Sequence, residues 1–155
     1  MVVSIWGKAT VENEFRCVIQ GEPASAKNQR RIIKVKGSPR IIKSAKAMAY
    51  SREFQSQCVP MEDPYECDVS LQVNVWYASR RPDLACIDLV QDLLQGYAYK
   101  NDRQVKASMA LWGLDKGNPR CEIIVKPLPE FQSSLGVSSL PLSAIWDHPM
   151  TEQTD

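Results

Sequence analysis

The stretch of alternating residues at 66–79, ECDVSLQVNVWYAS, constrains the fold of this chain more than any other segment. Apolar side chains occupy every second position, namely Cys67, Val69, Leu71, Val73, Val75 and Tyr77. Polar side chains occupy the positions between them, namely Asp68, Ser70, Gln72 and Asn74. Because successive side chains of a β-strand point to opposite faces of the sheet, this alternation predicts a strand with one apolar and one polar face.

Further strands and two helices are predicted on both sides of this segment. Residues 14–21 predict a strand, residues 32–43 a basic hairpin, and residues 44–57 a helix with Ser44 as its N-cap. Residues 84–95 have the spacing of a second helix, and residues 105–114 and 120–128 predict a closing hairpin around the turn DKGNP. These elements predict an α+β fold, a single small domain with a mixed β-sheet and two main helices.

The charges divide the chain of 155 residues into a basic part and an acidic tail. Between Lys27 and Arg52 there are nine Lys or Arg residues and no Asp or Glu. After Lys126 there is no Lys or Arg, and four acidic residues give that segment a charge of −4. Since the whole chain carries +1 and this segment −4, residues 1–126 carry +5. We expect one folded domain over residues 1–126 and a flexible acidic tail over residues 127–155.

Several classes of chemistry lack the residues that they need. No two of the five cysteines form a C-x-x-C pair, so neither disulfides nor a thiolate zinc site is predicted. We expect the cysteines to be small buried residues of a cytoplasmic protein. The only histidine, His148, lies in the predicted tail, which leaves a Ser-His-Asp or Cys-His site without a base in the folded part. No glycine motif for cradling phosphates occurs. No segment is long and apolar enough for a signal peptide or a membrane span, so we expect a soluble, cytoplasmic protein.

Residues 80–95, RRPDLACIDLVQDLLQ, place two arginines and an aspartate in front of the second predicted helix. On a helical wheel Ala85, Asp88 and Asp92 fall in one narrow sector, and apolar side chains fill most of the remainder. Asp83 sits where a strand ends and a helix begins, a position at which functional groups are often displayed. A structural alternative remains open: Asp83 caps the helix, and the other two aspartates face solvent and pair with the two arginines.

Four segments occur in an order that is more specific than any one of them. They are GEPASAKNQRR at 21–31, SAKAMAY at 44–50, RRPDL at 80–84 before an apolar helix, and GYAYKNDRQV at 96–105. This order resembles the RusA family of Holliday junction resolvases, which has a basic S-K-N-R-R-type loop, a following helix, an R-x-D-L-D-N-type segment and a Y-x-D-D-R/A-Q-type segment. The resemblance covers roughly residues 15–126 and implies a RusA-like, dimeric fold with endonuclease activity.

The resemblance also implies a magnesium site and names its residues. Asp83 matches the first aspartate of the D-L-D pattern and Asp102 the second of the D-D pair, so both are expected to be catalytic and to bind Mg²⁺, which Mn²⁺ could replace. Ala85 occupies the position of another essential aspartate and cannot bind a metal. Because Mg²⁺ held by clustered carboxylates supplies the charge stabilisation that phosphodiester hydrolysis needs, cleavage is expected to be weak or absent. Either Asp88 or Asp92 could donate a replacement carboxylate.

The basic segment indicates nucleic acid as the partner, because Lys and Arg bind phosphates with release of counterions. The residues expected to contact four-way or branched DNA are Lys27, Asn28, Arg30, Arg31, Lys34, Lys36, Arg40, Lys43, Lys46, Arg80, Arg81 and Lys100. A junction must be nicked on two strands, so two sites related by a two-fold axis, and hence a homodimer, are expected. Two other functions stay open: a branched-DNA-binding protein that does not cleave, and a dimeric protein-binding module.

Overall fold

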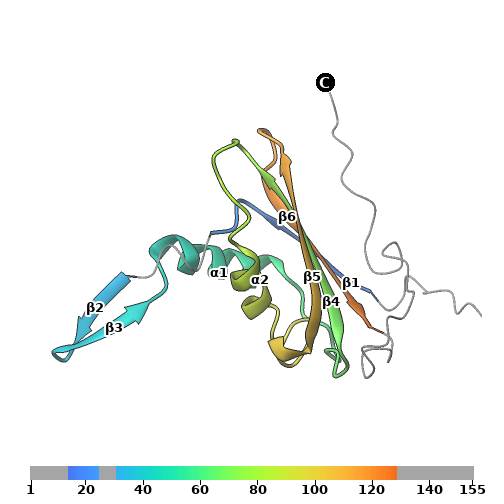
Figure 1. Cartoon of the computed structure of the whole chain (residues 1–155), viewed down its shortest axis with the longest axis horizontal. Coiled ribbons are helices and arrows are strands. Elements are labelled where there is room, and N and C mark those ends of the chain that lie inside the picture. Colours follow the sequence, from blue (N-terminus) through green and yellow to red (C-terminus); the bar gives the residue numbers. More distant parts are fainter. Residues whose placement is uncertain (1–13, 25–30, 129–155) are drawn as a thin grey trace, which may run out of the picture.

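A computed structural model of the chain describes residues 14–24 and 31–128. Its elements are β1 (Phe15–Gln20), β2 (Arg31–Val35), β3 (Ser38–Ile42), α1 (Ala45–Gln57), β4 (Val69–Tyr77), α2 (Ile87–Leu93), the 3-10 helix η2 (Asp102–Gln104), β5 (Val105–Leu114) and β6 (Arg120–Pro127). Figure 1 shows α1 and α2 against one face of a four-stranded sheet, while β2 and β3 form a separate hairpin that projects from the body. The predicted α+β class, with a mixed sheet and two helices, is confirmed.

Strand β4 lies inside the larger sheet, whose order is β1-β6-β4-β5. It pairs in parallel with β5, from Val69↔Val105 to Tyr77↔Leu114, and antiparallel with β6. The predicted closing hairpin of residues 105–114 and 120–128 is therefore wrong, because β4 lies between these two consecutive strands. Their connection crosses the end of β4, where the backbone N–H of Asp115 donates to the carbonyl oxygen of Tyr77 at 2.8 Å.

The hydrophobic core lies between the sheet and the two helices. The apolar residues of β4 that face it are at most 1% exposed, and they are Val69, Leu71, Val73, Val75 and Tyr77. Helix α1 covers them with Ala47, Tyr50 and Phe54, and α2 with Leu89 and Val90. Since full burial of a Val or Leu side chain is worth about 1.5–3 kcal/mol, this layer is a major source of the stability of the domain.

The polar face of β4 is also buried, which accounts for the interior position of this strand. Ser70, Gln72 and Asn74 are at most 6% exposed, and Nε2 of Gln72 donates to Oδ1 of Asn74 at 3.1 Å. A strand with little exposed surface on either face is stable inside a sheet, where neighbouring strands flank both of its edges. A hairpin between β5 and β6 would leave β4 without one of these neighbours.

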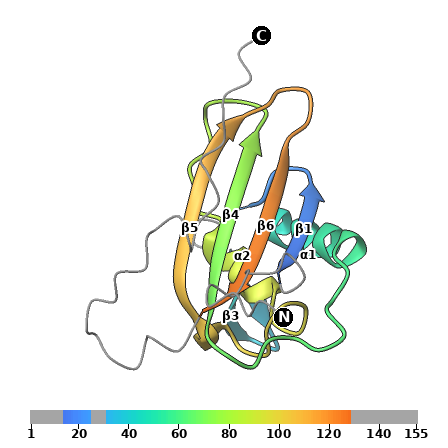
Figure 2. The same ribbon diagram turned by 90° about the vertical axis from the view of Figure 1, so that its right-hand side faces the viewer.

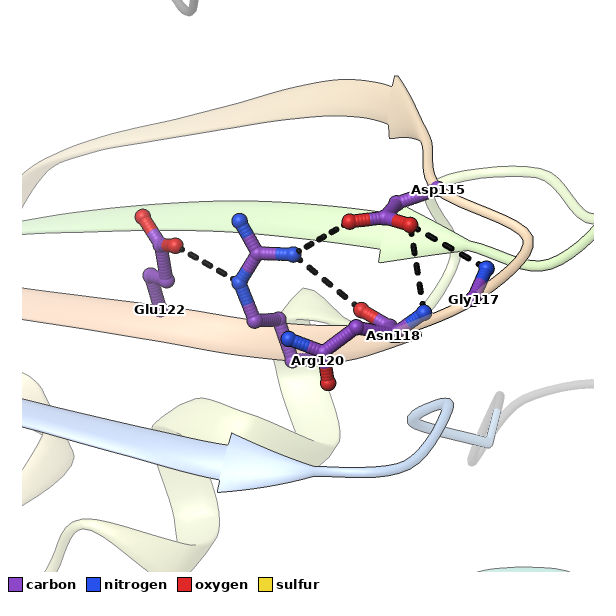
Figure 3. A network of polar contacts seen from close by, with 5 residues as sticks. All are labelled: Asp115, Gly117, Asn118, Arg120 and Glu122. Carbon is purple, nitrogen blue, oxygen red and sulfur yellow. Dashed lines mark hydrogen bonds and ion pairs between the residues drawn. The ribbon is translucent and has the colours of Figure 1, made fainter.

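The connection between β5 and β6 is held by the network of polar contacts in Figure 3. Oδ1 of Asp115 accepts from the backbone N–H of Gly117 at 3.2 Å and from that of Asn118 at 3.1 Å. The guanidinium of Arg120 donates to Asp115 and to Glu122, each at 2.9 Å, and stacks over the ring of Trp76 with 4.7 Å to its centroid. This network is a structural feature that fixes the end of the sheet from which the loop after β4 departs.

The helices match the prediction to different extents. Helix α1 has the predicted N-cap, because Oγ of Ser44 accepts from the backbone N–H of Ala47 at 3.1 Å. Helix α2 begins at Ile87 rather than at the predicted Leu84, because the preceding loop is held by the sheet, as described below. None of the helices within residues 14–24 and 31–128 has the length and apolar character needed to cross a membrane. Strand β6 includes Pro127, and the predicted tail beyond residue 128 lies outside the described residues.

Gly96, which follows α2, provides a test of the backbone geometry. Its φ of 83° lies in the left-handed region, and a Cβ added there would meet no atom within 4 Å. We therefore expect Gly96→Ala to lower the free energy of unfolding by about 1–2 kcal/mol through backbone strain alone. Urea unfolding should show a lower midpoint with an unchanged slope.

Gly117→Ala is the matched control for this substitution. Gly117 lacks a positive φ, and its added Cβ would lie 3.8 Å from Oδ1 of Asp115, an ordinary contact. Its unfolding midpoint should therefore stay close to that of the unaltered protein. Equal midpoints for the two glycine variants would contradict the left-handed conformation at Gly96.

Candidate functional site

The loop between β4 and α2 carries Asp83, and the sheet holds this loop in place. The phenol of Tyr77 donates to the carbonyl oxygen of Asp83 at 2.8 Å, and Nε1 of Trp112 donates to the carbonyl oxygen of Pro82 at 3.1 Å. The carboxylate of Asp83 accepts from the backbone N–H of Ala85 at 3.3 Å and remains exposed. Asp83 therefore caps the turn before α2, whereas the N-cap of the helix itself is Cys86.

A pocket of about 600 Å³ opens beside Asp83. Its walls come from the end of β1 and the residues after it, from the first turns of α1, and from the loop before α2. Its charged lining residues are Glu22, Lys46, Glu53, Arg81 and Asp83. Oε1 of Glu22 accepts from the backbone N–H of Ala78 at 2.7 Å, so this carboxylate ties the beginning of the loop to the end of β1.

The groups beneath Asp83 are neutral at physiological pH. Burial raises the pKa of the Tyr77 phenol, and the nearby Cys86 thiol and Asp83 carboxylate raise it further. Burial likewise raises the pKa of the Cys86 thiol. Because the charged forms of both groups are disfavoured, neither offers an anionic nucleophile, and the pocket presents only carboxylates and cations as ionised groups. Four of the five free cysteines are buried as predicted, whereas Cys67 is exposed.

Asp102 lies in a second segment, which Gln104 fixes. Oε1 of Gln104 accepts from the backbone N–H groups of Lys100 and Asn101 at 3.0 and 2.8 Å. Its Nε2 donates to the carbonyl oxygens of Tyr65 and Cys67 at 2.7 and 2.8 Å. One side chain thus satisfies four backbone groups and joins the segment around η2 to the residues before β4.

The segment with Asp102 also contacts the second half of α2. Nε2 of Gln91 donates to the carbonyl oxygen of Asp102 at 3.4 Å, and the phenol of Tyr99 donates to the carbonyl oxygen of Gln91 at 2.6 Å. Burial raises the pKa of Tyr99, and the negative charges of Asp102 and Asp92 raise it further. The negative charges of Asp92 and Asp102 both reach Tyr99, so these two aspartates share a neighbourhood.

The two aspartates that the resemblance names are thus at different places in the fold. Asp83 lines the pocket and Asp102 does not. Figure 2 shows that the loop after β4 and the segment before β5 begin at opposite ends of the sheet, since these strands are parallel.

The fit of these residues to a metal ion can be tested within one chain. Carboxylate oxygens are suitable ligands for Mg²⁺. Across residues 14–24 and 31–128, however, no three His, Cys, Asp or Glu side chains are grouped so that they could hold one ion. Ala85 contributes no ligand, and Asp88 and Asp92 do not complete a group with Asp83. The described part of a single chain therefore does not form a three-ligand metal site.

The predicted DNA contacts are distributed over the hairpin, the pocket and the loop. Lys34, Lys36, Arg40 and Lys43 are exposed on or beside the β2–β3 hairpin, Lys46 lines the pocket, and Arg80 and Arg81 are exposed in the loop. Lys100 forms an ion pair with Glu66, and this pairing lowers the pKa of that carboxyl group. Lys27, Asn28 and Arg30 lie outside the described residues, as does the side chain of Arg31. In the part of the chain that is described, Arg80 and Arg81 form no ion pair, so the alternative that pairs them with Asp88 and Asp92 is not supported.

Sequence reasoning missed the residues that position the two segments. Gln104 belongs to the GYAYKNDRQV motif, so its place in that motif could have indicated a role. Glu22 likewise belongs to the GEPASAKNQRR segment. Tyr77 was identified only as an apolar strand residue, and Trp112 carries no sequence signal, because each contacts a segment far away in the chain.

One comparison with known proteins identifies a family. A family model described as endodeoxyribonuclease RusA matches residues 20–126, a range that includes the hairpin, the pocket and both aspartate segments. No curated protein matches the chain. The matched range agrees with the extent of the described domain, from the end of β1 to β6.

The contact between Tyr77 and Asp83 predicts that a single hydroxyl group stabilises the loop. Removing it in Tyr77→Phe should cost about 1 kcal/mol of stability, since the carbonyl oxygen of Asp83 loses its donor. Hydrogen exchange at the backbone N–H of Ala85 should become faster, because the turn that Asp83 caps opens more often.

Tyr97→Phe removes the same group elsewhere and serves as the control. The ring of Tyr97 packs edge-on against Phe54, with 5.3 Å between centroids, and its hydroxyl makes no hydrogen bond within the described residues. Stability and exchange at Ala85 should be unchanged in this variant. An equal effect of both substitutions would contradict a specific role for the Tyr77 hydroxyl.

Proposed function

The chain belongs to the endodeoxyribonuclease RusA family, a family of DNA endonucleases that resolve Holliday junctions, and on this premise we propose that it binds four-way or otherwise branched DNA. We propose further that it is a structure-specific endonuclease whose Mg²⁺-dependent nicking is weakened or lost in this chain. The observation that carries the proposal is the pocket beside Asp83, which is lined by Arg81 of the loop and by Lys46 at the start of α1, the helix that follows the basic hairpin. A phosphate backbone attracted by these cations would pass the Asp83 carboxylate.

The proposed DNA-binding surface joins the pocket to the hairpin. Lys46 and Arg81 line the pocket, and Arg80 is exposed beside it. The basic residues of the hairpin continue this surface away from the body, and Lys27, Asn28, Arg30 and Arg31 belong to the same stretch of sequence. Because each neutralised phosphate releases counterions, binding through this surface should weaken steeply as salt is added. Lys100 contributes less, since Glu66 already offsets its charge.

The proposed metal ligands are Asp83 and Asp102, with Mg²⁺ as the ion and Mn²⁺ as a substitute. When bound, such an ion supplies a Lewis acid for the phosphoryl oxygens and lowers the pKa of a bound water. Without a carboxylate at Ala85, and without a three-ligand group in the described part of one chain, we propose that the ion binds weakly. Asp92 is a better candidate than Asp88 for a replacement ligand near Asp102. The negative charges of Asp92 and Asp102 both raise the pKa of the Tyr99 phenol, so both carboxylates lie in its neighbourhood.

Ala85 favours a second candidate function, a protein that binds branched DNA and does not cut it. Such a protein would bind DNA through the same basic surface, since the basic residues attract phosphates whether or not a metal ion is bound. The two candidates differ only in whether Asp83 and Asp102 take part in catalysis.

We also propose a homodimer, formed through the outer edge of β5. Within the described residues β5 pairs only with β4, and its ten residues VKASMALWGL include a single charged side chain, Lys106. A long edge strand with little charge readily pairs with another strand. At the opposite edge of the sheet, by contrast, the side chain of Gln57 contacts the end of β1. Its Oε1 accepts from the backbone N–H of Gln20 at 2.7 Å, and its Nε2 donates to the carbonyl oxygen of Gln20 at 3.5 Å.

Antiparallel pairing of β5 with β5 of a second copy would make one continuous sheet around a two-fold axis. That axis would be perpendicular to the sheet, so the helical layers and the Asp83 pockets of both copies would lie on the same side. Two pockets on one side could act on two strands of a single junction.

Sedimentation of the unaltered protein at micromolar concentration should therefore show a dimer. Leu111→Lys, which adds a like charge to β5 of each copy, should shift the equilibrium toward monomer. Val18→Lys adds the same charge to β1, where Val18 is 49% exposed, and should leave the dimer intact. A dimer unaffected by Leu111→Lys would reject the β5 interface, and a protein that is monomeric with and without DNA would reject paired sites altogether.

The endonuclease proposal is tested by restoring the missing carboxylate. We expect Ala85→Asp to produce Mg²⁺-dependent nicking of a four-way junction, at least tenfold above that of the unaltered protein, because a ligand returns beside Asp83. Adding Asp83→Asn or Asp102→Asn to this variant should abolish the gain. The measurement is a gel assay for nicked strands with Mg²⁺, Mn²⁺ or a chelator.

Ala85→Asn is the matched control, since it has nearly the shape of aspartate without its charge. It should bind the junction as Ala85→Asp does, yet give no nicking. If Ala85→Asp nicks no branched substrate in either metal, the endonuclease proposal fails and the non-cleaving DNA-binding protein remains.

A further inference from the structure

The β2–β3 hairpin exposes a pair of isoleucines that are not part of the hydrophobic core. Ile32 and Ile41 are register partners, so their side chains lie on the same face of the hairpin. They are 72% and 66% exposed, which makes them two of the most exposed large apolar side chains of the described residues. Figure 1 shows the hairpin projecting from the body, and β2 and β3 form a sheet of their own.

The hairpin has a defined local geometry despite this isolation. Its turn residues Lys36 and Gly37 both have positive φ, 49° and 82°, which is the geometry of a two-residue turn suited to the twist of paired strands. A two-stranded hairpin is only marginally stable in water by itself. A binding partner that covers the isoleucine pair would therefore also stabilise the hairpin.

The charge of the hairpin indicates the chemistry of that partner. Lys34 lies on the same face of the hairpin as the isoleucines, Lys36 lies in the turn, Lys43 follows β3, and Arg40, the register partner of Ile33, lies on the opposite face. No acidic residue occurs between Arg31 and Arg52. Two such hairpins would repel each other, which disfavours contact between the hairpins of two copies. A partner that combines dense negative charge with exposed apolar surface fits both features.

Branched DNA has this combination at the branch point. Along an intact duplex the bases are stacked, and the grooves present mainly hydrogen-bonding groups. At a branch point the stacking is interrupted, so base faces are accessible between charged backbones. Apolar side chains such as isoleucine are known to enter base steps in this way, and the cost of unstacking is lowest where stacking is already lost.

The isoleucine pair lies at the end of the hairpin nearer to the pocket. Ile41 precedes Lys46, which lines the pocket, by five residues, so their Cα atoms are at most about 17 Å apart. The turn at Lys36 and Gly37 lies at the far end. DNA bound along the hairpin would therefore place phosphates against its outer cations and a base step against the isoleucines, next to the Asp83 pocket.

We propose that Ile32 and Ile41 form an apolar wedge that enters the open base step at a DNA branch point and gives the protein its preference for branched over unbranched DNA. This inference rests on the proposed binding of branched DNA. The isoleucine pair would provide the preference for branched over unbranched DNA, and the cations of the hairpin would provide affinity for both DNAs.

The test compares a four-way junction with a duplex of the same length and sequence. The variant is Ile32→Thr with Ile41→Thr, which keeps β-branched side chains in the strands but makes them polar. We expect its junction affinity to fall roughly tenfold and its duplex affinity to change less than about twofold, with an unchanged salt dependence. A fluorescent 2-aminopurine placed beside the branch point should brighten with the unaltered protein and not with the variant.

Two further variants separate the contributions. Lys34→Ala with Lys36→Ala should weaken binding to both DNAs in parallel and lower the salt slope by about 2. Val59→Thr makes a similar change at a site that is 79% exposed and outside the hairpin, so it should affect neither DNA. Circular dichroism and urea unfolding should show that every variant stays folded, since the isoleucines lie outside the core.

The outcomes distinguish this inference from the function on which it rests. Equal losses on both DNAs, or no loss on the junction, would overturn the wedge while leaving DNA binding in place. A shift from dimer to monomer in the double-threonine variant would assign the pair to contact between copies and also overturn it. Failure of the unaltered protein to bind any DNA at low salt would remove the proposed function and the wedge together.

Discussion

The burial of β4 on both faces is the constraint on which the rest of the structure depends. Its apolar face packs against the two helices, and its polar face is equally shielded, so the strand requires neighbours along both edges. Strand β6 occupies one edge and β5 the other, and parallel pairing with β5 requires the chain to return across the sheet through α2. The loop that leaves the end of β4 thereby lies over the pocket, and the segment that precedes β5 lies at the other end of the sheet.

This arrangement places the candidate functional residues in three parts of the structure. The first is the pocket with Asp83, held by hydrogen bonds from Tyr77 and Trp112. The second is the Asp102 segment, clamped by Gln104. The third is the basic hairpin, which is attached next to the pocket and has no core of its own. Positioning by the sheet matters for the proposed roles of Asp83 and Asp102, because a carboxylate can assist phosphodiester chemistry only from a fixed place.

The proposed roles of Asp83, Ala85 and Asp102 would make DNA binding and DNA cleavage separable properties of this chain. Binding depends on long-range attraction between phosphates and exposed cations, which tolerates changes at a single position. Metal-dependent cleavage depends on several oxygen ligands within a few ångströms of one ion, so the loss of a single ligand would weaken it. The proposal is therefore that this member of a junction-cutting family recognises branched DNA while cutting it poorly.

The sequence by itself determined the strands, the basic hairpin, helix α1 with its Ser44 cap and the apolar face of β4, because these features depend on local periodicity and local hydrogen bonds. It also determined the family, through the order of its motifs. Only the tertiary structure decided that β4 separates β5 from β6, that α2 begins at Ile87, and that Asp83 lines the pocket while Asp102 does not. The physical reason is that these features depend on partners far away in the chain, such as Trp112 for the loop and Tyr65 for Gln104, and no spacing in the sequence records such contacts.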